Sequence, residues 1–193
     1  MTPKGVTMTP KDLTPKFQHA GEEVVKALRQ ADLKKVLLAY GGLVKVYADI
    51  AYMGPRPQLA AEADKLAKDY AQAAKSPDVA EISGNSQNVM DKVGPPAARS
   101  LAKLTKFLAK GDLKSFLQHY GGDTGAYAWS LLGSLRGMSA SKALKALHRS
   151  QEDLDMASMK DAKKVKESVR SESLHEQRRL MGIENRYDWT VND

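Results

Sequence analysis

Residues 31–42 read Ala-Asp-Leu-Lys-Lys-Val-Leu-Leu-Ala-Tyr-Gly-Gly, and residues 111–122 read Gly-Asp-Leu-Lys-Ser-Phe-Leu-Gln-His-Tyr-Gly-Gly. Asp32 and Asp112 are 80 residues apart, and the same offset holds without a gap on both sides of the two stretches. Chance does not keep so many positions in one register, so the sequence predicts a tandem duplication of a helical unit. The further identical pairs are Pro15 with Pro95, Lys26 with Lys106, Leu28 with Leu108, Tyr47 with Tyr127, Arg56 with Arg136 and Ala63 with Ala143.

The duplicated unit has the pattern of an all-α fold with about four helices per copy. Apolar residues recur at helical spacing over residues 15–30 and again after Asp32. Asp32 and Asp112 precede such runs and are predicted to be helix N-caps, since a short carboxylate can accept from free backbone N–H groups. The Gly-Gly pairs that follow are predicted to end these helices. Further helices are expected over residues 43–53 and 57–74, with counterparts in the second copy.

The chain divides into five predicted segments. Three Thr-Pro-Lys triplets begin within residues 1–14, and their prolines disfavour a helix and predict an extended arm there. The two copies cover residues 15–75 and 95–150, and residues 76–94 between them are rich in Ser, Gly and Asn, as in a linker. Residues 151–193 are predicted to form a long charged helix followed by an aromatic docking tail.

The composition of the chain excludes several kinds of protein. Of its 193 residues, 42% are hydrophobic, which suffices for a core, and only 6% are aromatic. There is no cysteine, which excludes disulfides, thiolate metal sites and a cysteine nucleophile. No apolar run has the roughly 20 residues of a membrane span, and the N-terminus lacks the pattern of a signal peptide. We expect a location in the cytoplasm or inside an assembled particle.

The net charge of +7 lies mostly in the second copy, which alone carries +7, whereas residues 151–193 carry −2. In that copy, four basic residues at spacings of 4, 3 and 4 share one predicted helix face. Such a face suits a phosphate backbone or an acidic protein surface, and it can also be a solvated face or one paired with carboxylates. The candidate binding residues are Arg99, Lys103, Lys106, Lys110 and Lys114, with a second row of Lys142, Lys145 and Arg149.

No pattern of catalytic or ligand-binding residues stands out. The four histidines are scattered without the spacing of a metal site, and His119 corresponds to Ala39 in the first copy. The glycine-rich residues 121–125 lack the Gly-Lys-Ser/Thr sequence of a phosphate-binding loop. The tyrosines that recur with the repeat are interpreted as packing anchors. We therefore expect a non-enzyme with no metal, cofactor or small-molecule substrate.

The C-terminal segment carries the best candidate for partner binding. Residues 152–180 are strongly charged with only a thin apolar stripe, so this helix is not expected to enter the core of a monomer. It is followed by Ile183, Tyr187 and Trp189. Aromatic residues often dominate interface energetics, so these three are predicted either to bind a second subunit or to dock onto the chain's own body.

The sequence thus favours a structural or scaffolding protein that assembles with itself or into a larger complex through residues 151–193. Phage particles and other large assemblies use small duplicated helical parts of this kind, which is an analogy and not a family resemblance. The alternative is a nucleic-acid-associated protein that uses the basic face of the second copy. An enzyme ranks third.

Overall fold

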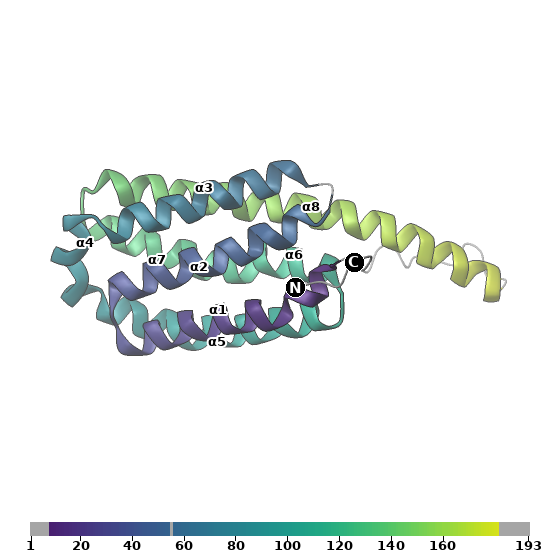
Figure 1. The fold of residues 1–193 in the computed structure, drawn as a ribbon, viewed down its shortest axis with the longest axis horizontal. Helices are drawn as coiled ribbons and strands as arrows, with labels where there is room; N and C mark the ends of the chain where they lie inside the picture. Colours follow the sequence, from purple (N-terminus) through teal and green to yellow (C-terminus); the bar gives the residue numbers. More distant parts are fainter. Residues whose placement is uncertain (1–7, 55, 182–193) are drawn as a thin grey trace.

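The computed structural model describes residues 8–54 and 56–181, with side chains up to Val165. This part of the chain consists of helices and turns and contains no strand, as the sequence predicted. Three helical segments of the first half form one layer, and three of the second half form another (Figure 1). In the first layer, η1 (Pro10–Leu13) leads into α1 (Thr14–Gln30), α2 (Leu33–Tyr52) and α3 (Pro57–Ala74).

The second layer repeats this order after a helical connection. It consists of α5, then a long segment in which α6, the π-helical turn η3 and α7 follow one another without a break, then α8. The layers pack with α1 against α5 and α3 against α8. The bounds are α4 (Pro77–Ile82), η2 (Ser83–Ser86), α5 (Gln87–Ala109), α6 (Leu113–His119), η3 (Tyr120–Thr124), α7 (Gly125–Met138) and α8 (Lys142–Met181).

The predicted N-caps are confirmed in both layers. The carboxylate of Asp32 accepts a hydrogen bond from the backbone N–H of Lys35 at 3.2 Å, and that of Asp112 accepts from Ser115 at 3.1 Å. The preceding helix ends with a left-handed residue in each case, Ala31 with φ 52° and Gly111 with φ 74°. The chain therefore turns in the same way between the first two helices of each layer.

The prediction that the Gly-Gly pairs end helices is wrong. α2 runs through Gly41 and Gly42, and the second layer stays helical through Gly121 and Gly122. The first glycine of each pair is buried against the third helix of its layer, while a Cβ on the second would meet nothing. Close approach of two helices, not helix termination, is the physical reason for the first glycine of each pair, Gly41 and Gly121. Each layer consequently has three helical segments instead of four.

Aromatic side chains fill the core between the two central segments. Tyr47 from α2 stacks on Tyr120 from η3 with ring centroids 4.0 Å apart, and it also stacks on Phe116 at 5.9 Å. Phe17 from α1 meets Phe116 edge to face at 5.1 Å. These rings come from both layers and belong to one continuous hydrophobic cluster. The two layers therefore share a single core.

Two segments expected to be irregular are helical. Residues 76–94 form α4, η2 and the start of α5, whose Met90 and Val93 are buried, and α5 continues past Pro95 and Pro96. Residues 10–14, assigned to the extended arm, form η1 and the start of α1. The backbone N–H of Thr9 donates to the carboxylate of Asp12 at 2.8 Å, which stabilises this first turn. Residues 1–7 lie outside the described part.

The first part of the predicted charged helix belongs to the core, contrary to expectation. α8 begins at Lys142 and continues without a break through residue 151, and Leu154, Ser158 and Ala162 are buried. Ser158 donates to the carbonyl of Leu117 at 2.7 Å and is also hydrogen-bonded to the hydroxyl of Tyr47. A polar helix can thus enter the core because its small polar side chains have hydrogen-bond partners there.

Candidate functional site

The predicted basic residues lie on the second layer, where the structure divides them among α5, α6 and α8. Arg99, Lys103, Lys106 and Lys110 are exposed along one side of α5, and we call these four the basic ridge. None of them forms an ion pair with a carboxylate in the described part of the chain. The ridge is therefore a row of solvated charges within the described residues, and pairing with Glu152 or Asp153 is not found there.

The second basic row does not extend the ridge. Lys142, Lys145 and Arg149 are exposed on α8, while the continuous segment from α6 to α7 lies between α5 and α8 (Figure 1). Lys114 is half-buried at the start of α6. The structure therefore does not bring the eight basic residues together on one helix face. The predicted tail residues Ile183, Tyr187 and Trp189 lie outside the described residues.

The structure reveals one constellation that the sequence analysis missed, a chain of hydrogen bonds from Ser100 through His119 to Asp123. Ser100 Oγ lies 3.0 Å from His119 Nε2, and His119 Nδ1 lies 2.9 Å from the Asp123 carboxylate. Thr124 Oγ1 lies 2.5 Å from the same serine oxygen. The order serine, histidine, carboxylate is that of a hydrolase triad. Burial lowers the pKa of His119, opposed by the charge of Asp123, so the imidazole is neutral at pH 7.

The surroundings of Ser100 favour a structural role for this constellation. Ser100 is only 5% exposed and does not line the adjacent cavity of about 300 Å³, which is bordered by His119, Asp123 and Phe107. Both His119 and Thr124 already lie against its oxygen. A nucleophile needs space for the substrate, and Ser100 lies on the buried face of α5, away from the cavity. The chain of hydrogen bonds instead joins α5 to α6 and η3.

A second polar cluster lies where α8 packs against α3 of the first layer and α7 of the second. Tyr70 donates to the amide oxygen of Gln151 at 2.6 Å, and the Gln151 amide nitrogen donates to Asp155 at 2.9 Å. Burial raises the pKa of Asp155 to about 8, although the hydrogen bond from Gln151 opposes the shift. A Cβ on Gly125 would overlap the Asp155 carboxyl group, so this glycine gives the acid its space.

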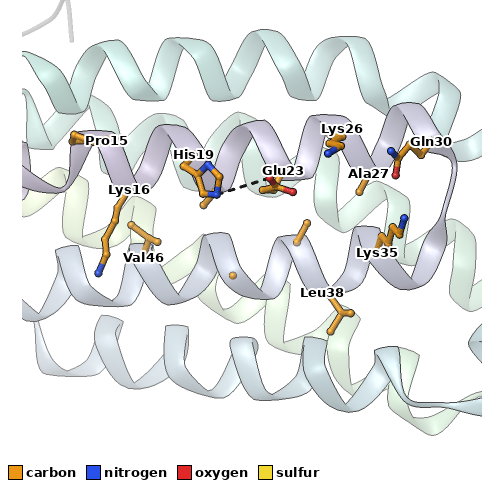
Figure 2. A pocket seen from close by; sticks show the side chains of 13 residues that line it. Pro15, Lys16, His19, Glu23, Lys26, Ala27, Gln30, Lys35, Leu38 and Val46 are labelled. Atoms are coloured by element: carbon orange, nitrogen blue, oxygen red, sulfur yellow. Dashed lines mark ion pairs between the residues drawn. The ribbon is translucent and has the colours of Figure 1, made fainter.

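A surface groove with a volume of about 860 Å³ lies between α1 and α2 on the outer side of the first layer (Figure 2). Its floor consists of small or apolar side chains, and Leu38 at its edge is 49% exposed. Lys16, Lys26 and Lys35 line its rim, together with an exposed His19–Glu23 pair at 3.9 Å. We call this feature the α1–α2 groove. The floor residues are Ala20, Ala27, Ala39, Gly42 and Val46.

The corresponding groove in the second layer is largely filled. The 80-residue offset places Phe107 at the position of Ala27 and His119 at that of Ala39, and these two rings pack edge to face at 5.9 Å. The remaining cavity there is the one of about 300 Å³ beside His119. The two layers therefore share a backbone arrangement but differ in whether this groove is open.

Other kinds of site find no support in the described residues. No group of three histidine or carboxylate side chains in the described residues could hold a metal ion, and none of the described helices is long and apolar enough to cross a membrane. No known protein family matches the chain, and no curated protein sequence or solved structure matches it either.

Proposed function

We propose that this protein is a non-enzymatic structural component that assembles with copies of itself or with a larger complex through the end of α8 and the residues that follow. We also propose that its two layers arose by duplication of one helical unit. The caps, turns and buried glycines at equivalent positions support this second statement.

The observation that carries the assembly proposal is the length of α8. This helix has 40 residues, and its last buried residue in the described part is Ala162. From Val165 to Met181 a helix extends about 24 Å, at 1.5 Å per residue. Figure 1 shows this part of α8 projecting beyond the two layers. A helix that continues past the core it completes is suited to reach a neighbouring molecule.

Light scattering after size-exclusion chromatography tests the proposal. We expect the full chain to form an oligomer and a chain ending at Val165 to be a folded monomer, since the part of α8 that is removed projects beyond the two layers (Figure 1). A cut at residue 150 is unsuitable because it removes Gln151, Leu154 and Ser158 from the core. Equal masses per chain for the full and shortened proteins would contradict the proposal.

The alternative function, binding of nucleic acid, is favoured by the basic ridge, whose four side chains are exposed and aligned on α5. Phosphate contacts release counterions, so such binding must weaken steeply with salt. We expect a triple variant with Lys103, Lys106 and Lys110 changed to Glu to lose salt-sensitive DNA or RNA binding. A matched control changes three exposed lysines of the first layer, Lys65, Lys68 and Lys75, to Glu. Equal loss in both variants, or binding that salt does not weaken, would contradict this function.

A further inference from the structure

The fold does not require the α1–α2 groove to be open, because the equivalent groove of the second layer is filled. Its counterpart is filled by Phe107 and His119, so the fold tolerates large side chains at both positions. In the first layer the same positions are Ala27 and Ala39, and they leave an apolar floor beside the exposed Leu38. An open apolar groove on one copy of a repeat, with a filled equivalent on the other, indicates a binding surface.

We propose that the α1–α2 groove binds residues 182–193 of a second copy of this chain. This inference rests on the proposed function, in which the C-terminal extension mediates assembly, and it names the surface that receives the extension. The occupant is an acidic segment with apolar and aromatic side chains, and the site is an apolar floor with a basic rim.

The charges of the two surfaces are complementary. Lys16, Lys26 and Lys35 line the groove, and the one carboxylate on its rim, Glu23, lies beside His19. Figure 2 shows the Lys16 and Lys35 side chains at opposite ends of the groove. Residues 182–193 carry three carboxylates and one arginine, hence a net charge of −2. Long-range attraction of this kind speeds encounter and fixes the orientation of the bound segment.

The apolar side chains also match. The segment contains Ile183, Tyr187, Trp189 and Val191 within nine residues. A floor of alanine, glycine and valine allows large rings to approach the backbones of α1 and α2 closely. Rings buried in such a pocket commonly supply most of the binding energy of an interface.

The reach of the chain favours a second copy over the chain's own groove. The end of α8 lies about 24 Å beyond Val165. Trp189 follows Met181 by eight residues, which span at most about 28 Å when fully extended. Even a chain that ran straight back would only bring Trp189 to the near edge of the layers. The groove of another molecule has no such restriction.

The first test places a charge in the groove and the same charge at the equivalent position of the second layer. Leu38→Glu introduces a carboxylate at the exposed groove edge, and Gln118→Glu is its matched control, 80 residues further on and also exposed. We expect Leu38→Glu to weaken self-association of the full chain at least tenfold in light scattering over a concentration series, and Gln118→Glu to leave it unchanged. Ala39→His, which copies the second layer, should act in the same direction.

The outcomes separate this inference from the proposed function. A full chain that is monomeric, like the chain ending at Val165, would overturn both. A full chain that assembles, with Leu38→Glu and Ala39→His assembling equally well, would leave the proposed function standing and overturn the groove as its receiving surface. Circular dichroism of each variant verifies that the helices are retained.

A cross-link identifies which molecule supplies the segment. The chain has no cysteine, so single cysteines can be introduced without background. We expect a mixture of Leu38→Cys and Thr190→Cys chains to form a disulfide-linked pair under mild oxidation, and a mixture with Gln118→Cys in place of Leu38→Cys to form none. Equal linking to both positions would overturn the proposal. So would a disulfide within a single dilute chain that carries both Leu38→Cys and Thr190→Cys, because the segment would then reach its own groove.

Discussion

The two layers start from the same pattern and diverge at equivalent positions. In the first layer, Ala27 and Ala39 leave the groove between α1 and α2 open, and in the second, Phe107 and His119 close it. His119 then joins Ser100 and Asp123 in hydrogen bonds that the first layer does not have, since Ala20 and Leu43 stand at the equivalent positions. The second layer has the additional internal connections, and the first layer has the accessible surface. Two layers with the same backbone arrangement can thus differ in whether a surface groove is open or filled.

The layers also differ in how closely the third helix approaches. A Cβ on Gly41 would come 3.2 Å from the Cβ of Tyr70, whereas a Cβ on Gly121 would come 2.5 Å from the backbone oxygen of Asp155. The Cβ of Tyr70 would have to give way by only a few tenths of an ångström, whereas the contact with the Asp155 backbone oxygen is an overlap that requires a helix to shift. The crossing of η3 and α8 is therefore the tighter of the two.

The largest expected effect comes from Gly121→Ala, which forces α8 away from η3. We expect this variant to lower the free energy of unfolding by about 3 kcal/mol, and Gly41→Ala to lower it by about 1 kcal/mol. Gly122→Ala and Gly42→Ala are matched controls, because a Cβ meets nothing at either position. Alanine there should stabilise the helix by up to about 1 kcal/mol. Urea unfolding measures all four, and equal losses for Gly41→Ala and Gly121→Ala would remove the difference between the layers.

A smaller effect concerns Asp155, which is buried in the second layer, while the equivalent Lys75 of the first layer is exposed. Its pKa of about 8 in the fold lies above the value near 3.9 of an unfolded chain. The folded state thus holds a proton that the unfolded state releases, so this group lowers the stability as pH rises between about 4 and 8. The lowered pKa values of His119 and His148 act in the opposite direction near pH 6.

We therefore expect Asp155→Asn to gain stability over the unmodified protein as pH rises from 5 to 7, by about 2 kcal/mol. Glu152→Gln, an exposed change on the same helix, is the control and should follow the unmodified protein. Chemical unfolding at several pH values gives the two curves. Parallel curves for Asp155→Asn and the unmodified protein would show that the carboxyl group is ionised in the fold.

The smallest effect compares the two left-handed turns. Gly111 adopts a φ of 74° without a side-chain penalty, whereas Ala31 adopts 52° with one. We expect Gly111→Ala to lower the free energy of unfolding by about 1 kcal/mol and Ala31→Gly to raise it by up to about 1 kcal/mol. In a chain of this size, each corresponds to a change of roughly 2–4 °C in Tm. A loss of stability in Ala31→Gly would contradict the strain assigned to this residue.

Local signals predicted the local structure well. The class of the fold and the caps Asp32 and Asp112 follow from hydrophobic spacing and from the short range over which a cap acts. The Gly-Gly pairs were wrongly predicted to end helices because glycine is common both at helix ends and where two helices cross closely. Only the position of the neighbouring helix distinguishes these two cases.

The parts that the sequence did not reveal depend on contacts between distant residues. The burial of Ser158 depends on Tyr47, which lies 111 positions earlier in the chain. His119 and Asp123 are four residues apart, the spacing of neighbours on one helix face, so their contact could have been predicted. Nothing in the sequence near Ser100 indicated that it would contact His119. The groove depends on the relative placement of α1 and α2, so the alanines of its floor could be interpreted only as packing positions.

The placement of α8 has a consequence for how the protein is made. This helix is the last described element to leave the ribosome, yet Gln151 and Ser158 provide the hydrogen-bond partners of Tyr70 and Tyr47 in the first layer. Until residue 158 has been synthesised, two phenol groups of the first layer lack these partners, and the surface that α8 covers is exposed. The nascent chain therefore gains its final fold in one late step, instead of layer by layer as separate domains would.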